Sequence, residues 1–483
     1  MVSPAALLLV VALALPAGPA LSENGAPTLE SPASAPAVPL VLSPSLSQAA
    51  TEPAAEPDAE AQASDSAAIA STDAAVAPKL DTLAQVLAKV WRDNPQVVQA
   101  ERGLQATGFD IAAARSGYLP YLQVQTALAD NTEDSVSTLY AVLPLWNGGL
   151  TGAQVAEAKA RQKIAAAELV RVRQELGLQA VEAYVNVAQA QEQAVQWSAY
   201  VGALKRLLAS IQRRAAEGAA PEADVQTAVA RLRQAESGME GNRAVMLINR
   251  AQLARLLLAT PGSVDWPDDA YLLSDAEIES VGTRAELHPS RVLALAEVKT
   301  QEAVARGARA SLWPEVSLQH RRQLEGVVFD PSNDATLVVA QFQSNNGVRG
   351  FLGYKAEQQR LDSAKANADA VLREIAATVE VGRTQLATSA MQLLVQAQAA
   401  DASSALVDSF MRQYEVGRKT WLEVLNAQRE ANENFLQSIN LKRNYWYANA
   451  KLALDAMYWH RLGAGAAVAT ESAAATDESQ RDE

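Results

Sequence analysis

The sequence predicts a mostly α-helical, internally duplicated chain in which each half contributes one β-hairpin. Two long stretches, 151–216 and 353–412, contain no proline and repeat apolar residues at steps of three and four, which is typical of helices. Short segments with a two-residue apolar rhythm come before each long stretch, and that period is typical of strands. A similar glycine-marked turn also recurs in both halves, so the chain is best treated as a repeat.

The two glycine-marked turns are related by a constant offset of 199 residues. The matching pairs are Gly218 with Gly417, Asp224 with Glu423, Val225 with Val424, and Ala228 with Ala427. A glycine at a helix end followed by a new helix start is ordinary chemistry for a helical hairpin. The duplication makes the turn more informative, because it predicts a helix-turn-helix tip at the same place in each half.

The net charge of -14 lies mostly outside the helical part of the chain. Residues 21–78 contain eight acids and no Lys or Arg, and residues 466–483 contain five acids and one Arg, which leaves the middle near neutral. The acidity is therefore assigned to solvated flanks, and no basic patch suggests nucleic acid.

The composition leaves little material for catalysis or for a cofactor. There is no cysteine, and the three histidines lie far apart in no metal-ligand spacing. The glycine-rich run 347–355 lacks the Gly-Lys-Ser/Thr ending of a phosphate loop. We expect no enzyme activity, no metal and no cofactor.

Both ends of the chain are expected to lie outside the folded part. Residues 1–20 carry a short apolar run with a small-residue end, which predicts a secretory signal peptide although no Lys or Arg precedes the run. Residues 21–79 are rich in Ala, Pro, Ser and acids without periodicity, and predict a disordered linker. Residues 464–483 predict a disordered acidic tail.

Two structural repeats are expected between these ends, at 80–279 and 280–463. Their first parts align at an offset of 194, and the aligned pairs are Pro95 with Pro289, Arg115 with Arg309, and Pro120 with Pro314. In each copy an amphipathic helix begins after the first proline and ends at the second.

A β-hairpin follows each of these helices, at about 118–147 and about 314–346. Apolar and polar residues alternate, and aromatic residues lie near the strand ends, as in the segments of a transmembrane β-barrel. Four strands cannot close a barrel, but three chains would supply twelve, within the even range of about 8 to 26. The alternation alone fits two hairpins of a soluble sheet equally well.

The long helical segments favour the transmembrane barrel over the soluble sheet. A helix over 151–216 would be about 100 Å long, and 221–258 and 420–460 predict returning helices. Helices of this length need partners throughout, so an ordinary coiled coil is one interpretation. Alanine at many facing positions favours the close packing of several helices into a wall.

With this order of elements, the chain resembles the TolC-like outer membrane channel proteins over residues 80–463. The most specific pieces are the run LPLWNGG at 143–149, the two tips, and the Leu-Pro or Trp-Pro pair before each hairpin. The resemblance implies a homotrimer whose twelve-stranded antiparallel β-barrel lies in outer membrane lipid and continues into a long periplasmic α-helical barrel.

The resemblance also implies roles for residues at the tips. Glu423 matches an acidic ring in the periplasmic aperture, and Asn426 stands where the best-known members carry a second acidic ring. Asp224, Tyr414 and Lys419 match a latch that joins neighbouring helices, with Lys in place of the usual Arg. Without the resemblance, the two acids would be interpreted as ordinary helix N-terminal residues.

The predicted function is a passive exit duct of a tripartite export system. Gly218 and Gly417 mark tips that the resemblance assigns to contact with a periplasmic adaptor, which would couple the duct to an inner-membrane ABC or proton-driven transporter. The phrases around the tips resemble members that serve type I protein secretion, and multidrug efflux stays open. The alternative is a soluble periplasmic coiled-coil adaptor or scaffold.

Overall fold

The computed structural model describes residues 82–462 except 129–134, 326–327, 330–334 and 343–346. All of them belong to one unit of the chain, Asp73–Glu483. The predicted signal peptide, linker and acidic tail lie outside the described residues. The elements in chain order are α1 (Leu83–Asp93), α2 (Pro95–Ser116), β1 (Tyr121–Leu128), β2 (Ser135–Trp146), α3 (Leu150–Ala216), α4 (Glu222–Leu257), η1 (Asp269–Tyr271), α5 (Asp275–Ser280), η2 (Val281–Leu287), α6 (Pro289–Ala310), β3 (Glu315–Glu325), β4 (Val328–Phe329), β5 (Ala335–Gln341), α7 (Gly347–Glu415), α8 (Trp421–Asp455) and η5 (Trp459–Leu462).

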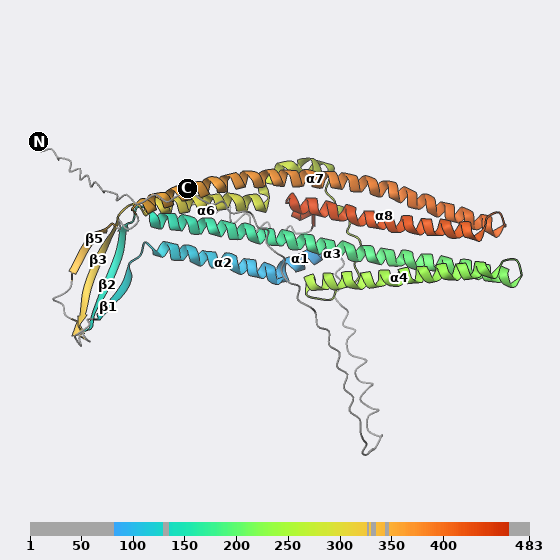
Figure 1. The fold of residues 1–483 in the computed structure, drawn as a ribbon, viewed down its shortest axis with the longest axis horizontal. Helices are drawn as coiled ribbons and strands as arrows, with labels where there is room; N and C mark the ends of the chain where they lie inside the picture. Colours follow the sequence, from blue (N-terminus) through green and yellow to red (C-terminus); the bar gives the residue numbers. More distant parts are fainter. Residues whose placement is uncertain (1–81, 129–134, 326–327, 330–334, 343–346, 463–483) are drawn as a thin grey trace, which may run out of the picture. The chain divides into compact units, whose positions relative to one another are not determined.

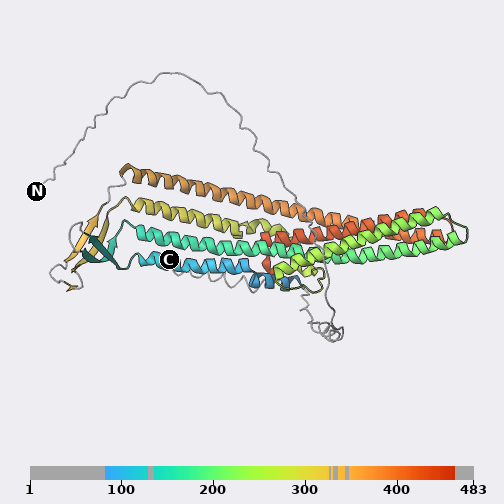
Figure 2. The same ribbon diagram turned by 60° about the horizontal axis from the view of Figure 1, so that its bottom comes forward.

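Two helical hairpins with very long first arms form most of the described chain. Helix α3 has 67 residues and α7 has 69, so each is about 100 Å long. Helix α3 returns as α4 and α7 returns as α8, while α3 also contacts α6 and α8 (Figures 1 and 2). The predicted long helices are confirmed. Within the described residues, no helix is both long and apolar enough to cross a bilayer.

The return of α8 is shorter than the sequence predicts. Helix α8 ends at Asp455, not at His460, because Met457 has a left-handed φ of 60°. The Tyr458 amide then donates to the Ala453 carbonyl at 2.7 Å, which closes the helix end. The turn buries Trp459, which stacks on Trp91 of α1 with 5.6 Å between the ring centroids. Burial of this aromatic pair outweighs the propensity of the sequence to continue the helix.

The two β-hairpins join in one antiparallel sheet. Strand β2 of the first half pairs with β3 of the second half, so the order of the long strands is β1-β2-β3-β5, and the short β4 pairs with the end of β3. Tyr140 lies opposite Arg321 across the central pair. The outer strands β1 and β5 each pair on one side only among the described residues.

The register separates the sheet into two faces. Leu122 and Val124 of β1 share a face with Leu139 of β2, whereas Gln123 and Gln125 share the other face with Tyr140. The apolar face of β1 therefore continues on β2 through the odd-numbered positions. The even-numbered positions of β2, Tyr140 among them, lie on the face of Gln123 and Gln125.

The run LPLWNGG forms the joint between sheet and helix. Gly148 and Gly149 have left-handed φ values of 64° and 90°, and Gly149 is the N-cap of α3. A Cβ at Gly148 would lie 2.8 Å from both the Ala310 carbonyl oxygen and the Trp313 Cβ, so only glycine fits there. The first repeat is thereby held against the start of the second hairpin, where Trp146 and Trp313 form an edge-to-face pair.

The seam between α3 and α8 is partly polar. Gln189 and Gln193 both donate from Nε2 to Asn440 Oδ1, at 2.6 and 2.8 Å, and Gln196 donates to the buried Asn432 at 3.3 Å. Apolar clusters lie on either side of this seam. One is centred on α1 and the ends of α4 and α8, and the other lies near the tips.

Candidate functional site at the helical tips

Both tips have the same backbone closure. In the first, Gly218 has φ of 72° and the Ala219 amide donates to the Arg214 carbonyl at 2.7 Å. In the second, Gly417 has φ of 74° and the Arg418 amide donates to the Gln413 carbonyl at 2.8 Å. Each is a Schellman-type helix end with glycine in the left-handed region. The two turns, 199 residues apart, therefore have the same backbone conformation.

Glu423 is held by its own helix start. Thr420 is the N-cap of α8, and its hydroxyl accepts from the Glu423 amide at 3.3 Å. In return, Glu423 Oε2 accepts from the Thr420 amide and hydroxyl, each at 2.9 Å. This reciprocal arrangement is a capping box. Without it, the first amides of α8 would lack side-chain acceptors.

Lys419 completes this cluster. Its Nζ donates to Glu423 Oε1 at 2.6 Å and lies 4.4 Å from the centre of the Phe410 ring. The Lys419 ammonium first, and then the bonds from Thr420, lower the pKa of Glu423 to about 2. The Glu423 side chain is still 43% exposed, so the carboxylate is charged, internally paired and within reach of solvent. Asn426 follows one turn later and is exposed.

Asp224 occupies the equivalent position at the first tip without equivalent partners. It is the third residue of α4, as Glu423 is the third of α8, but the N-cap of α4 is Pro221, which has no side-chain hydrogen bond. Within the described part of the chain, the Asp224 carboxylate has neither a hydrogen bond nor an ion pair. It is half-buried, at a helix N-terminus whose dipole favours a negative charge.

Tyr414 lies in the apolar cluster that joins the two tips. Its side chain is 4% exposed, and its hydroxyl is buried without a hydrogen-bond partner in the described residues. The Arg214 guanidinium lies over the Tyr414 ring at 4.4 Å from its centre and donates to the Tyr414 carbonyl oxygen at 3.3 Å. Tyr414 thus connects α7 with the end of α3.

The structure brings some of the predicted tip residues together and leaves others apart. Lys419 is paired with Glu423, while Asp224 is paired with neither Lys419 nor Tyr414 within one chain. The residue that the sequence did not indicate is Arg214. Its repeat partner is Gln413, so the repeat gives no signal for a cation there, and its place in the last turn of α3 is ordinary for an arginine.

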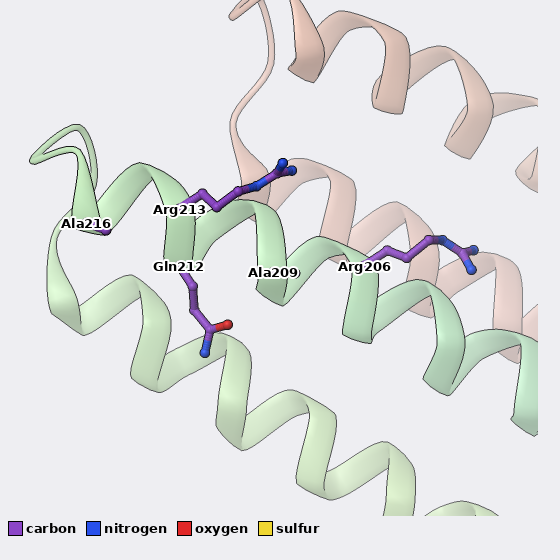
Figure 3. A pocket seen from close by; sticks show the side chains of 5 residues that line it. All are labelled: Arg206, Ala209, Gln212, Arg213 and Ala216. Atoms are coloured by element: carbon purple, nitrogen blue, oxygen red, sulfur yellow. The ribbon is translucent and has the colours of Figure 1, made fainter.

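A shallow hollow lies on α3 just before the first tip. It is lined by one face of the helix, at Arg206, Ala209, Gln212, Arg213 and Ala216 (Figure 3). The two arginines are exposed and have no ion pair among the described residues. Ala209 between them and Ala216 after them carry small side chains, so the hollow is an open cationic surface and not an enclosed cavity for a substrate.

The described residues contain no group of three or more His, Asp or Glu side chains that could hold a metal ion. The histidines have local roles. His288 Nδ1 accepts from the Ser290 amide at 3.2 Å at the start of α6, and burial lowers the pKa of His288. His320 bonds to Thr336 across two strands, and His460 lies 3.9 Å from Glu277.

The chain is similar in sequence and in fold to several known proteins. The family model described as outer membrane efflux protein matches residues 86–257. The outer membrane efflux protein BepC of Brucella suis biovar 1 (strain 1330) is 20% identical over 362 residues, which is 72% of this chain and 79% of that protein. VceC from Vibrio cholerae, an outer membrane protein, superposes with a TM-score of 0.67 at 18% identity, over 79% of this chain and 96% of that chain. The Campylobacter jejuni CmeC outer membrane channel also gives a TM-score of 0.67, at 14% identity over 79% of this chain and 86% of that chain.

One sheet of two hairpins that continues into two long helical hairpins is therefore the fold of outer membrane channel proteins. The outer membrane efflux protein model covers part of the chain, and the predicted resemblance to the TolC-like outer membrane channel proteins is confirmed. The relatives named above are described as outer membrane proteins. The family is described by transport and not by an enzymatic reaction.

Proposed function

We propose that the chain is the exit duct of a tripartite export system. In this proposal three copies form a twelve-stranded β-barrel in the outer membrane, and their long helices form a tunnel that continues into the periplasm. The observation that carries the proposal is the sheet itself. Strands β1 and β5 are unpaired on their outer sides among the described residues, and a sheet in lipid must have no open edge. Three sheets of four long strands close such a barrel within the known range of about 8 to 26 strands.

The two faces of the sheet support this closure. The face with Gln123, Gln125 and Gln319 also contains the buried residues Val142 and Ser317, so it is the more enclosed face. We assign it to the lumen. The opposite face exposes Leu122, Val124 and Val338 and is assigned to lipid.

Apolar residues exposed on the long helices support packing between copies. Helix α7 exposes Val381, Met391, Leu394 and Val395, and α4 exposes a group that includes Leu247. Stripes of this kind on a single chain indicate a protein contact. A neighbouring copy would cover them along the length of the tunnel.

The gate of the duct would lie at the tips. Among the described residues, neither the buried Tyr414 hydroxyl nor the Asp224 carboxylate has a hydrogen-bond partner. We propose that these two groups bond between helices of neighbouring copies, with Lys419 beside them. Glu423 would form the acidic ring of the aperture, and its bond to Lys419 would reduce the field of that ring. Asn426 adds no charge to a second ring.

The tips would also contact the adaptor. Gly218 and Gly417 place no side chain at either turn, and a Cβ built at either position meets open space. The exposed Arg206 and Arg213 beside the first tip have no ion pair among the described residues and offer an acidic partner two cations. The adaptor would join the duct to an ABC transporter or a proton-driven pump in the inner membrane. Whether proteins or small molecules are exported depends on that transporter.

Cysteine cross-linking tests the closure of the sheet, because the chain has no native cysteine. Strands β1 and β5 are three strand spacings apart in one chain, about 14 Å. Gln123→Cys on β1 combined with Leu337→Cys or Val339→Cys on β5 can therefore be joined only between copies. We expect covalent dimers and trimers from the double variants after oxidation in membranes, and none from Gln123→Cys alone.

Only monomers from every double variant would contradict the trimeric barrel. Release of the protein by osmotic shock without detergent would instead favour the soluble periplasmic adaptor or scaffold. Cross-linking of Arg213→Cys in cells to the adaptor and its transporter would then decide between type I protein secretion and multidrug efflux. Capture of an ABC transporter with a protein substrate supports the first, and capture of a proton-driven pump supports the second.

A further inference from the structure

We propose that neighbouring copies of the chain are locked together at two heights by knob-into-hole contacts, in which α7 of one copy meets α2 and α4 of the next. Phe109 of α2 is one knob and Met391 of α7 is the other. The inference rests on the proposed function, and it deepens it by naming the helix faces and the residues that bind the second copy.

The outer helices of the chain are joined to the outer strands. Helices α2 and α4 pack on α3, and α7 packs on α6 and α8. Helix α2 is the element before strand β1, and α7 is the element after β5. When β1 of one copy pairs with β5 of the next, α2 of the first copy therefore lies beside α7 of the second. Helix α1 contacts both α2 and α4, so α4 extends the same edge toward the tips.

Phe109 points away from the rest of its own chain. Its side chain is 79% exposed, whereas Ile111, two residues further and on the opposite side of α2, is buried. A single exposed ring is ordinary on a protein surface. Phe109 becomes informative because a matching surface lies at the same height on α7.

The hole for Phe109 lies near the start of α7. In coiled-coil packing, one knob enters a hole formed by four residues of the facing helix, at positions i, i+3, i+4 and i+7. Four exposed residues of α7 have this spacing, and they are Leu352, Lys355, Ala356 and Gln359. Helices α2 and α7 run in opposite directions, so heights are counted from the sheet. Phe109 is seven residues from the sheet end of α2 at Ser116, and the hole spans the fifth to the twelfth residue after Gly347. Knob and hole therefore agree in height to within one helical turn.

A second knob and hole lie nearer the tips. Met391 of α7 is 62% exposed. The hole on α4 has the same spacing and is also exposed, and it consists of Ala244, Leu247, Ile248 and Ala251. The two tips share one apolar cluster, so heights here are counted from the tips. Leu247 lies 25 residues after the first residue of α4, and Met391 lies 24 residues before the last residue of α7. Both are thus about 37 Å from the tips.

The arrangement of the two contacts commits this surface to a second copy. In each contact, knob and hole lie on opposite edges of the same chain, so one chain cannot bring them together. Complementary surfaces on opposite edges close into a ring when the rotation between copies is fixed. Both contacts use α7 of the same neighbour, and they therefore demand the same rotation as the pairing of β1 with β5.

Cysteine cross-linking in membranes tests both contacts, because the chain has no native cysteine. The matched pairs are Phe109→Cys with Ala356→Cys and Leu247→Cys with Met391→Cys. We expect covalent dimers and trimers from both pairs with a short thiol cross-linker. The exchanged pairs, Phe109→Cys with Met391→Cys and Leu247→Cys with Ala356→Cys, use the same four positions about 50 Å out of register and should give monomers only.

The stability of the trimer gives an independent measurement. Phe109→Ser and Met391→Ser remove the knobs, so we expect their detergent-extracted trimers to dissociate at a lower temperature than the parent. Val195→Ser is the matched control, because Val195 is 72% exposed but lies on α3, which has helices on both sides. Its trimers should dissociate at the parent temperature. Phe109→Leu fills part of the hole and should lie between the parent and Phe109→Ser.

The edge cross-link of Gln123→Cys with Leu337→Cys or Val339→Cys separates the possible failures. Edge dimers without dimers from either matched helix pair would overturn the interface and keep the barrel, whereas absence of both would remove the trimeric duct itself. Equal yields from matched and exchanged pairs would show chance collisions. Cross-linking of the matched pairs to a different protein would place another partner on this edge. A fall in dissociation temperature as large in Val195→Ser as in Phe109→Ser would show a general effect of lost apolar surface, and would also overturn the contacts.

Discussion

The two helical tips have the same backbone and use their acidic residue differently. Each ends its long helix with glycine in the left-handed region and places an acid at the third position of the returning helix. At the second tip, Thr420 and Lys419 bind Glu423 within the chain. At the first tip Pro221 replaces the threonine, and the Asp224 carboxylate has no partner in the part of the chain that the structure describes. One cap residue thus decides whether the acid stabilises its own helix or is available to a neighbour.

Replacing Tyr414 is expected to have the largest effect. Tyr414→Ala removes a buried ring and its stack with Arg214, at a cost of about 3–5 kcal/mol in the free energy of unfolding. In planar bilayers we expect a higher single-channel conductance than in the parent. Tyr414→Phe keeps the packing and removes only the hydroxyl, so a rise in its conductance would assign the gate to that hydroxyl. Asp224→Ala should raise conductance too, and unchanged conductance in all three variants would remove both residues from the latch.

Substitution of either tip glycine should lower the free energy of unfolding by almost the same amount. Gly218→Ala and Gly417→Ala each force a left-handed φ on a residue with a Cβ, which costs about 1–2 kcal/mol. No neighbouring atom lies within 4 Å of the added Cβ, so strain is the only direct penalty. Denaturant unfolding of the two variants measures this. A difference well above 1 kcal/mol would show that the two turns are not equivalent in the assembled protein.

Giving the first tip the N-cap residue of the second should bind the acid of the first tip within its own helix, and removing the N-cap threonine from the second tip should release the acid there. Pro221→Thr with Asp224→Glu gives the first tip the capping box of the second, and should stabilise α4 by about 1 kcal/mol. The new glutamate would be bound within its own helix, so the latch should weaken and conductance should rise. Thr420→Ala is the matched loss at the second tip, and should destabilise α8 by about the same amount. A conductance equal to the parent in the double variant would show that the freedom of Asp224 does not matter.

The smallest change in stability is expected when the pH is lowered into the range in which Glu423 becomes protonated. The pKa of Glu423 is lowered to about 2, chiefly by Lys419, so its stabilising contribution is fully present above the ordinary carboxyl range near 4.5. This contribution is lost as pH falls from about 4.5 to about 2. In Glu423→Gln the melting temperature should depend less on pH in this window, and block by multivalent cations at neutral pH should be weaker. Equal block in parent and variant would remove Glu423 from the aperture ring.

Much of the fold follows from local rules, which is why the sequence predicts it. Proline-free periodic stretches predict α3 and α7, and the paired glycines predict both tips. The LPLWNGG run carries the resemblance, and its two consecutive glycines adopt φ values that other residues avoid. In contrast, the early end of α8 depends on the distant partner Trp91, which no local pattern contains.

The sequence predicts where the residues of the candidate site lie along the chain, but not which side chains they bond to. The offset of 199 locates Asp224 and Glu423, yet the pairing of Lys419 with Glu423 depends on rotamers at a helix start, and the contact of Arg214 with Tyr414 depends on how two hairpins pack. A sequence lists the groups that can bond, whereas packing selects among them. The contacts between copies stay predictions for the same reason.

The amide seam between α3 and α8 has a mechanical consequence. Gln189 and Gln193 share one acceptor, Asn440, so this acceptor is already offered donors one helical turn apart. Amide side chains exchange protein partners for water at a net cost of only about 1 kcal/mol each. This seam therefore opposes a small shift of α3 along α8 only weakly, and the apolar clusters on either side of it set the limit of that shift.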